Sequence, residues 1–492
     1  MTAFCLSSRH GAIRCAVLLV TGVLLVSCGP GPFAVQERSL PGSSALGAND
    51  TFYNGTDPDQ WYLRSVRAPE AWGLYASLQQ DPVIAGDLST TTVAVIDTWI
   101  DTSHIDLRSV LAGPLVDSVA SQFSASQAEH GTHVAALAAG QSNDGVGIAG
   151  VAYNRDGMVS AGLLPIRGLE TEGNGAISDL LSAITAVSDF QNLTGSRVVV
   201  NLSLGSPDEQ GPIANLAIQE LVSGNALVVA AAGNGIRGGC EGRFGGVNWP
   251  ANMDEVMAVG SVNFASDRSA SERSAFSDYG PEIELMAPGS LLDCTTGVIS
   301  AVPNGRWALK AGTSMATPLV AGAAATVWSA NPRLSASDLR RILHESALDL
   351  GPAGRDIEYG YGLLDMEAAL RMAVSGQWGR FQGQSGAPSA DALQAVEQSP
   401  ETLSPPGGST SAVVVLGYPG VDLSAAVASA AATSGLAGDR FAGRELGSLR
   451  AGPLLRVGLP ADDRSATAFV DALRVHPAVR GLSWDQPIST GR

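Results

Sequence analysis

Apolar and polar positions alternate in blocks along residues 51–375, and the blocks are of two lengths. Short apolar runs predict buried strands, and longer runs between them predict helices. The predicted strands are Thr92–Ile96, Val198–Leu204, Ala226–Ala231, Val256–Val262 and Glu284–Ala287. The predicted helices are Gly131–Ala139, Ser178–Phe190, Pro212–Ser223 and Ser314–Ala330. Strands that alternate with helices indicate an α/β fold whose mostly parallel sheet is covered on both faces.

A second ordered segment, residues 411–492, follows a linker-like stretch. Residues 376–410 are rich in Gly, Ser, Pro and Gln, a composition typical of linkers. The elements predicted after it are a strand at Val413–Leu416, a helix at Asp422–Ser434, strands at Leu446–Leu449 and Leu454–Leu459, a helix at Asp462–His476 and a strand at Gly481–Trp484. This βαββαβ order predicts a small, ferredoxin-like α+β domain.

The N-terminus has the features of an export signal. Arg9 and Arg14 precede the apolar run Ala16–Val26, which is shorter than the roughly 20 residues that a membrane-spanning helix needs. Leu25-Val26-Ser27-Cys28 resembles the bacterial lipobox. We therefore expect residues 1–27 to be a lipoprotein signal peptide, Cys28 to carry a lipid anchor and residues 28–50 to be flexible. The alternative is an ordinary signal peptide with an incidental cysteine.

With that anchor, we expect an exported, membrane-anchored lipoprotein on the cell surface, or in the outer membrane or periplasm.

The composition of the chain excludes some classes of function. The 492 residues are 45% hydrophobic, which excludes a disordered chain, and carry a net charge of −18 without a basic cluster. Nucleic-acid binding is therefore not expected, while an acidic surface leaves room for bound cations.

Cysteine use fits an oxidising compartment. Cys5 and Cys15 leave with the signal, so only Cys240 and Cys294 remain in the folded region. An even pair predicts a disulfide, and two separate buried thiols are the alternative.

Three segments carry residues suited to nucleophilic catalysis. Asp97 ends a predicted strand, His130 begins a predicted helix in His-Gly-Thr-His, and Ser314 opens another helix in Gly-Thr-Ser-Met. Serine is a weak nucleophile that needs an adjacent base, itself oriented by a buried acid. Strand ends and helix starts meet at one rim of an open α/β sheet, so the three side chains can converge there.

Each segment alone is weak evidence for a catalytic site. Together, in the order Asp, His, Ser, the three segments resemble the subtilisin-like serine peptidases, and subtilisin is the reference example of this order. The resemblance covers residues 51–374 and continues through further signatures. These are Val199–Gly205, Ala230–Gly235, Asn248–Ala251, Phe276–Gly289 and Tyr361–Asp365. The α/β-hydrolase alternative requires G-x-S-x-G, which does not surround Ser314. The resemblance implies a three-layer subtilisin-like fold and a serine endopeptidase that works through an acyl-enzyme.

The resemblance also implies a role for each matching residue. Ser314 is the nucleophile, His130 the general base and acid, and Asp97 the acid that holds the imidazole. Asn234 is the side-chain donor of the oxyanion hole, partnered by the Ser314 N–H, and His133 is a structural histidine. No cofactor is needed for catalysis.

Substrate and metal positions follow from the same resemblance. The segments Gly173-Asn174-Gly175 and Ser203-Leu204-Gly205 match the two edges between which a substrate peptide lies, and Gly233 matches a wall of the first specificity pocket. We expect peptide or protein substrates and a monomer. The positions that match structural calcium ligands are Asp57, Asp106 and Asp144. Solvated surface acids are the alternative interpretation of those three.

The sequence departs from the family pattern in two ways, and the first departure suggests an alternative function. Trp99 follows Asp97-Thr98 where the family has Gly, so its ring must either line a substrate pocket or disturb the acid; Ala136 also replaces a glycine. A catalytically impaired, peptide-binding protein is therefore the alternative to an active peptidase.

The second departure concerns the prodomain. Family members usually carry an N-terminal βαββαβ prodomain, for which residues 29–50 are too few, yet Ala468–Pro487 resembles the end of one. Our hypothesis is that residues 411–492 form a C-terminally placed, prodomain-like or inhibitor-like module. The alternatives are an unrelated ferredoxin-like domain or a partner-binding module. Regulation of other subtilases in trans by this domain could coexist with either an active or an impaired peptidase.

Overall fold

The computed structural model describes most of the chain. The described residues are 16–20, 23–27, 45–53, 60–81, 84–119, 129–170, 173–235, 240–292, 297–375, 412–417, 419–434, 443–449, 452–459 and 463–490. The predicted lipidation site Cys28, the metal candidate Asp57, the disulfide candidate Cys294 and the predicted linker 376–410 lie outside these ranges.

The chain divides into two units, residues 1–40 and residues 41–492. In the first unit, β1 (Ala16–Val20) and β2 (Val23–Ser27) pair as antiparallel strands. They lie within the apolar run of the predicted signal peptide. Among the described residues, no helix combines the length and the apolar character required to cross a membrane.

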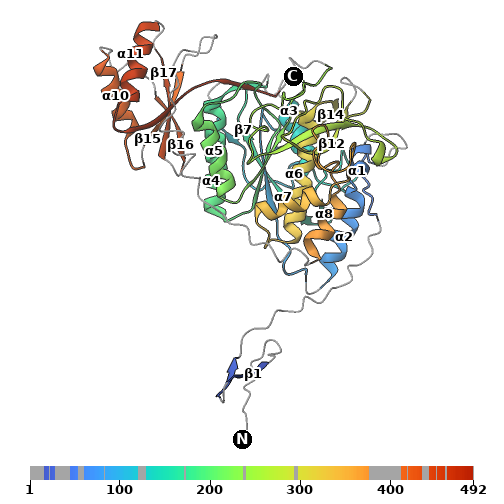
Figure 1. Cartoon of the computed structure of the whole chain (residues 1–492). Coiled ribbons are helices and arrows are strands. Elements are labelled where there is room, and N and C mark those ends of the chain that lie inside the picture. The colour runs from blue at the N-terminus through green and yellow to red at the C-terminus, as the bar shows by residue number, and fades with distance from the viewer. Residues whose placement is uncertain are drawn as a thin grey trace. The chain divides into compact units, whose positions relative to one another are not determined.

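The second unit is built on a seven-stranded sheet with strand order β12-β11-β10-β9-β3-β7-β4 (Figure 1). All its neighbouring strands run parallel. Its strands are β3 (Thr91–Asp97), β4 (Val116–Asp117), β7 (Ala161–Arg167), β9 (Val198–Leu202), β10 (Leu227–Ala231), β11 (Met257–Asn263) and β12 (Ile283–Ser290). The expected α/β fold with a mostly parallel sheet is confirmed.

Sequence analysis missed β7, an internal strand that lies between β3 and the edge strand β4. The strand reads Ala-Gly-Leu-Leu-Pro-Ile-Arg. Glycine weakens a strand and proline cannot donate to its neighbour, so the sequence did not predict a central strand here. Burial on both faces holds β7 in the sheet, since all its residues are buried.

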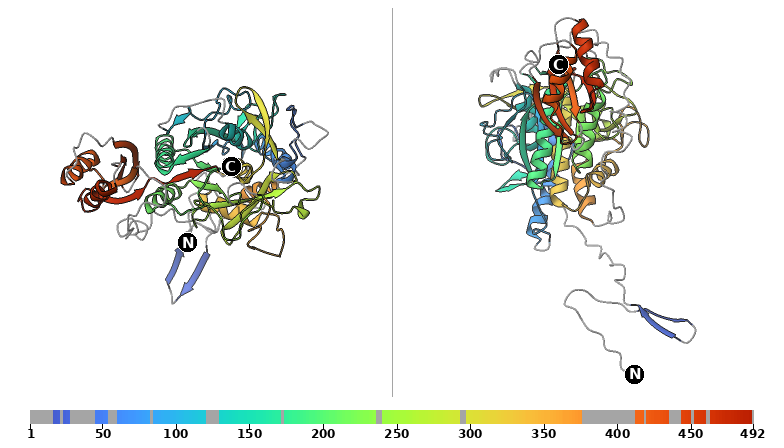
Figure 2. Two further views of the ribbon diagram at one scale, coloured as in Figure 1. Left: turned by 90° about the horizontal axis from the view of Figure 1, so that it is seen from above. Right: turned by 90° about the vertical axis from the view of Figure 1, so that its left-hand side faces the viewer.

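Helices cover both faces of the sheet (Figures 1 and 2). Val93 and Val95 of β3 belong to the hydrophobic core on one side, and the alternate residues Ala94 and Ile96 belong to the core on the other. Residues of α2 (Ala68–Gln80), α3 (Glu129–Ala139), α6 (Thr313–Ala330), α7 (Ala336–Glu345) and α8 (Met366–Val374) contribute to the first core. Residues of α4 (Ile177–Thr194) and α5 (Pro212–Ser223) contribute to the second.

Smaller elements complete the peptidase-like part. These are α1 (Trp61–Ser65), the 3-10 turn η2 (Arg268–Ala270), the pair β5 (Asn154–Arg155) and β6 (Met158–Val159), and the hairpin β13 (Val298–Val302) and β14 (Arg306–Lys310). The ordered part begins before the predicted boundary at residue 51. Ala48 and Asp50, expected in the flexible segment, are buried, and the Leu46 N–H donates to Pro69 O at 2.8 Å.

The C-terminal elements follow the βαββαβ order. They are β15 (Ala412–Gly417), α10 (Leu423–Thr433), β16 (Gly443–Leu449), β17 (Gly452–Gly458), α11 (Asp463–Arg474) and β18 (Val479–Trp484). The strands form an antiparallel sheet with order β16-β17-β15-β18. A last strand, β19 (Pro487–Ser489), leaves this sheet and pairs with β8 (Asn174–Ala176).

The two faces of the C-terminal sheet have different neighbours. Val413 and Val415 of β15 share a core with residues of α10 and α11. The alternate residues Val414 and Leu416 instead belong to the core that contains α4 and α5. The C-terminal sheet is therefore buried on one face by its own helices and on the other by the peptidase-like part.

Candidate active site

Asp97 lies at the carboxyl end of β3 and is completely buried. The Thr98 N–H donates to its Oδ1 at 2.7 Å. His130 lies in the first turn of α3, and its Nδ1 is 2.8 Å from the same Asp97 oxygen. A carboxylate that accepts the Nδ1–H fixes the imidazole with Nε2 as its basic nitrogen.

The start of α3 is held directly against the end of β3. The Gly131 N–H donates to Thr98 Oγ1 at 2.9 Å. A Cβ at Gly131 would lie 2.7 Å from Thr98 O and 2.9 Å from Trp99 O, so only glycine fits this approach. Trp99 is half-buried in this turn, and the Asp97–His130 contact is intact beside it.

Ser314 lies in the first turn of α6, which packs against α3. Gly312, with φ of 150°, precedes this turn in a conformation that favours glycine. Ser314 is buried, and its Oγ lies 3.3 Å from each of two carbonyl oxygens, those of Ser203 and Thr490. The structure thus places the predicted nucleophile at a helix start beside the helix that carries His130.

Asn234 is oriented by the residue before Ser314. Its Oδ1 accepts hydrogen bonds from Thr313 N and Thr313 Oγ1, both at 2.9 Å. Because this atom accepts two hydrogen bonds, it is the amide oxygen, and the second terminal atom of the amide is Nδ2, a hydrogen-bond donor. Thr313 Oγ1 also lies 3.3 Å from the Gly233 N–H, which links Gly233 to the same turn.

Gly233 itself has φ of 117° and tightly packed surroundings. A Cβ there would lie 2.3 Å from Asp278 Oδ2 and 2.8 Å from Asn248 Nδ2. Asp278 is completely buried, and its carboxylate accepts the Gly235 N–H at 3.1 Å and the Arg243 N–H at 2.6 Å. Burial raises the pKa of Asp278, although these bonds oppose the rise.

His133 lies one turn of helix after His130 and is completely buried. Its Nε2 is 3.1 Å from both Val298 O and Ala308 O, which belong to β13 and β14. Burial lowers the pKa of His133 to about 3, and the charge of Lys310 adds to the effect. The side chain is therefore neutral near pH 7 and ties α3 to the hairpin.

The two predicted cleft edges lie on either side of β19. Ile488 pairs with Gly175 of β8, and Ser489 pairs with Gly205 on the other edge. The Gly205 N–H donates to Ser489 O at 2.7 Å and the Ser489 N–H donates to Gly205 O at 2.9 Å. The edges therefore accept an extended backbone between them, and here the backbone belongs to the chain itself.

A buried acidic group lies apart from these residues. Asp106 accepts Trp307 Nε1 at 2.8 Å and is completely buried, while its Oδ1 has no hydrogen-bond partner among the described residues. Burial raises the pKa of Asp106 to about 7, with smaller contributions from the charges of Asp144 and Asp50. Asp50 accepts the N–H groups of Asn143 at 2.8 Å and Asp144 at 3.2 Å.

Sequence analysis included Asp106 and Asp144 but missed Asp50, which fell in the segment expected to be flexible. The donor chemistry of this group, carboxylates beside a backbone loop, suits a hard cation. Within the described ranges, no three His, Cys, Asp or Glu side chains cluster in a manner that would hold a metal ion alone. A cation here would therefore need backbone oxygens as well.

Cys240 is exposed and disulfide-bonded. The other cysteines, Cys294 among them, lie outside the described residues, so pairing with Cys294 stays a prediction.

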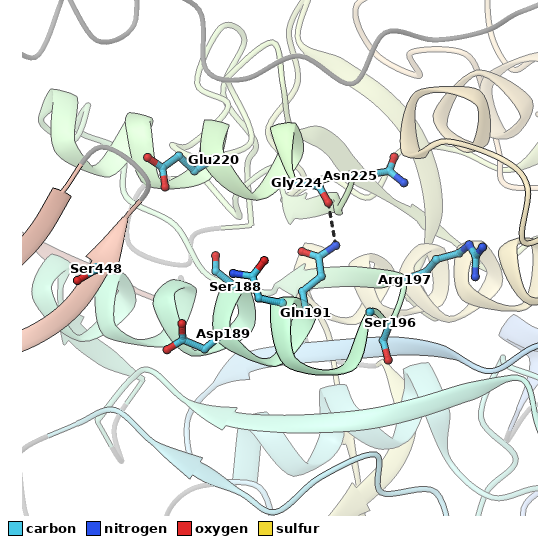
Figure 3. Close-up of a pocket in the computed structure, with 11 residues that line it drawn as sticks. Ser188, Asp189, Gln191, Ser196, Arg197, Glu220, Gly224, Asn225 and Ser448 are labelled. Carbon is cyan, nitrogen blue, oxygen red and sulfur yellow. Dashed lines mark hydrogen bonds between the residues drawn. The ribbon is translucent and has the colours of Figure 1, made fainter. Parts of the chain in front are cut away.

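A hollow of about 350 Å³ lies at one end of α4 and α5 (Figure 3). It is lined by polar side chains, among them Asp189, Arg197 and Glu220, and by Ser448 of the C-terminal sheet. None of its lining residues is a predicted site residue, so the hollow has no part in the proposed chemistry.

Several known proteins are similar to this chain. The model of the subtilase family matches residues 89–362. Subtilisin DY of Bacillus licheniformis is 37% identical over 279 residues, which cover 57% of this chain and 90% of that protein. A subtilisin of Bacillus pumilus is 35% identical over 284 residues, which cover 58% of this chain and 92% of that protein.

The halolysin-like extracellular serine protease Nep of Natrialba magadii is 35% identical over 330 residues, covering 65% of this chain and 52% of that protein. Among solved structures, sphericase superposes with a TM-score of 0.51 at 27% identity, covering 63% of this chain and 99% of its own. The chain therefore belongs to the subtilase family and is a serine endopeptidase of the subtilisin type.

Proposed function

We propose that this subtilase is an exported endopeptidase whose catalytic groups are Asp97, His130 and Ser314, with Asn234 in the oxyanion hole. The observation that carries the proposal is the 2.8 Å contact between Asp97 Oδ1 and His130 Nδ1 of α3, a helix that packs against α6, whose first turn holds Ser314. An acid, a base and a nucleophile on three converging elements are what acyl transfer requires.

In the proposed reaction, Ser314 Oγ attacks the substrate carbonyl carbon while His130 Nε2 takes the hydroxyl proton. Asp97 keeps the imidazole oriented and stabilises its positive charge. Asn234 Nδ2 and the Ser314 N–H stabilise the oxyanion of the tetrahedral intermediate. The imidazolium then gives its proton to the leaving amine, and water attacks the acyl-enzyme by the same route in reverse.

Substrate peptides would bind as an added strand between residues 173–175 and 203–205. Main-chain hydrogen bonds supply binding without a sequence requirement, and pockets for alternate side chains supply specificity. Gly233, in the turn fixed by Thr313 and Asp278, would form part of one pocket wall.

Export is supported by the N-terminal signal pattern and by the extracellular relative from Natrialba magadii. Lipidation of Cys28 would anchor a monomeric enzyme to the membrane, on the cell surface or in the outer membrane or periplasm. A disulfide from Cys240 suits such a compartment.

A structural calcium ion is part of the proposal. Asp106, whose buried Oδ1 has no hydrogen-bond partner among the described residues, and Asp144 would supply carboxylates, and Asp50 is a further candidate. Asp57 stays a predicted ligand from the sequence alone. Bound calcium would offset the repulsion among these acids and hold the loop around residues 142–148.

Labelling with a fluorophosphonate tests the catalytic assignment. The parent chain, Ser314→Ala and the exposed-site control Ser448→Ala are incubated with the probe, and the labelled protein is quantified. We expect the parent and Ser448→Ala to be labelled, and Ser314→Ala not to be. Binding of peptides without labelling of any folded form would instead support the catalytically impaired, peptide-binding alternative.

A further inference from the structure

We propose that residues 487–490 act as a built-in competitive inhibitor, which occupies the substrate cleft of the same molecule and slows the peptidase until it is displaced. This inference rests on the proposed function, because it concerns regulation of that same site. It gives the C-terminal domain a role in cis and names the residues that perform it.

The first observation is the hydrogen-bond pattern of β19. Ser489 exchanges both main-chain hydrogen bonds with Gly205, at 2.7 and 2.9 Å, and the Thr490 N–H donates to Gly173 O at 2.8 Å. The segment thus satisfies both edges of the cleft at once. A substrate that binds as an added strand needs the same main-chain groups, so the two compete directly.

The second observation concerns the nucleophile. Ser314 Oγ lies 3.3 Å from Thr490 O and 3.3 Å from Ser203 O. A hydroxyl has a single proton, and donation to either carbonyl directs that proton away from an imidazole. Thr490 is also buried, so the segment covers the nucleophile as well as lying beside it.

The third observation is the depth at which the segment lies. Ile488 is buried and belongs to the core that includes Leu169 and Ile177. Gly173 approaches so closely that a Cβ there would lie 2.4 Å from Thr490 Oγ1. These contacts bury an aliphatic side chain in the cleft wall, and we expect substrates that compete for the cleft to carry an aliphatic residue at that position.

The segment is anchored immediately before it enters the cleft. The Ile177 N–H donates to Gln486 O at 2.8 Å. Asp485 accepts the Ser178 N–H and hydroxyl, and Arg456 of β17 bonds to the same carboxylate. The inhibitory strand therefore begins at a fixed point on α4.

The body of the C-terminal domain holds that point in place. Arg444 of β16 pairs with Asp179 of α4 at 2.9 Å and donates to Ser118 O at 2.6 Å. Gly447, at φ of 102°, lies against Thr185 of α4. Together with the shared core beneath Val414 and Leu416, these contacts make docking of the domain part of the fold.

Tethering makes a short strand an effective inhibitor. A segment held a few residues from its site acts at an effective concentration in the millimolar range. A free peptide displaces it only if the peptide binds more tightly or is present at a higher concentration. Because the tether is intramolecular, inhibition should not depend on protein concentration. Inhibition that grew with concentration would indicate occupation by a second copy and would overturn the proposal.

The test removes a single hydrogen bond of the strand. Ser489→Pro abolishes the N–H that donates to Gly205 O and lies beyond β18, so the C-terminal sheet should still form. Ser489→Ala is the matched control, since it keeps the N–H. We expect fluorophosphonate labelling of full-length Ser489→Pro to be about 10- to 100-fold faster than that of the parent, with Ser489→Ala remaining slow.

A second pair of variants tests the contribution of the buried Ile488 side chain. Ile488→Asp places a charge in the apolar wall and should also accelerate labelling, whereas Ile488→Val should not. Equal labelling rates for the parent, Ser489→Pro and Ile488→Asp, with circular dichroism showing folded proteins, would overturn the inference.

Amide hydrogen exchange separates failure of this inference from failure of the proposed function. In the inactive Ser314→Ala background, Gly205 N–H should be protected and should lose protection when Ser489→Pro is added. Absence of labelling in every variant, together with this change in protection, would refute the catalytic assignment but retain the cleft occupant. Unprotected Gly205 in the Ser314→Ala chain would refute the occupant.

Discussion

Asp485 of the C-terminal domain caps the helix on which Ser178 lies, 307 residues earlier in the chain. Its Oδ1 accepts the Ser178 N–H at 2.8 Å and its Oδ2 accepts the Ser178 hydroxyl at 3.0 Å. The residue at the N-cap position of α4, Ala176, provides no side-chain hydrogen bond to the helix. A carboxylate at a helix N-terminus satisfies free N–H groups and favours the helix dipole. The domain thus completes an element of the peptidase-like part.

Removal of this cap should destabilise the start of α4. Asp485→Ala in the Ser314→Ala background should lower the free energy of unfolding by about 1–3 kcal/mol, because the buried cap and its ion pair with Arg456 are lost together. Urea unfolding measures the loss, and amide exchange should rise in the first turn of α4. Asp471→Ala, an exposed acid on α11, is the control. An unchanged exchange rate at Ser178 would show that the cap contributes nothing.

Loss of Asn234, the proposed oxyanion donor, should reduce turnover far more than binding. In the Ser489→Pro background, where the cleft is expected to be open, Asn234→Ala should lower kcat by about 10²–10³, the range known from subtilisin itself for this donor, with KM little changed. Steady-state hydrolysis of a peptide substrate measures both constants. Asn192→Ala, exposed on α4, should match its parent. A rise in KM at constant kcat would assign Asn234 to substrate binding instead.

His133 should make the fold sensitive to acid. Its pKa is lowered to about 3 in the folded state by burial, while the unfolded side chain takes up a proton near pH 6.5. The stabilisation is therefore complete above pH 6.5 and is lost as pH falls from there toward 3, at about 1.4 kcal/mol per pH unit for this one proton. Urea unfolding of Ser314→Ala, with and without His133→Asn, should show a shallower acid slope for the variant. Parallel slopes would contradict a neutral His133.

Calcium should stabilise the chain through Asp106 and Asp50. At a concentration of 100 times its Kd, an ion bound only to the folded state adds about 2.7 kcal/mol, so Tm should rise with calcium and fall with a chelator. The rise should disappear in Asp106→Asn and shrink in Asp50→Asn, each measured in the Ser314→Ala background. Asp189→Asn, exposed on α4, should respond like its parent. A Tm that is insensitive to calcium would contradict a calcium site at Asp106 and Asp50.

Much of the site could be predicted because its residues occur in local patterns. Asp97, His130 and Ser314 each stand at the end of a strand or the start of a helix, and these boundaries follow from apolar periodicity and from glycines such as Gly312. The expected strand at Thr92–Ile96 and the observed β3 differ by one residue at each end. Asp50 could not be predicted in this way, since an acid in a polar stretch carries no signal until its burial is known.

The sequence by itself determined the alternation of strands and helices, the order of the proposed catalytic residues and the βαββαβ order of the C-terminal elements, because each depends on residues close together in the chain. The tertiary structure alone decided that β7 lies beside β3 despite its Gly and Pro, that Asp485 caps α4, and that β19 lies between Gly175 and Gly205. The physical reason is the same in each case. Hydrogen bonds between residues 70 positions apart, as in β3 and β7, or 307 apart, as in Asp485 and Ser178, leave no periodicity in the sequence. They form only when the folded cores bring the two segments together.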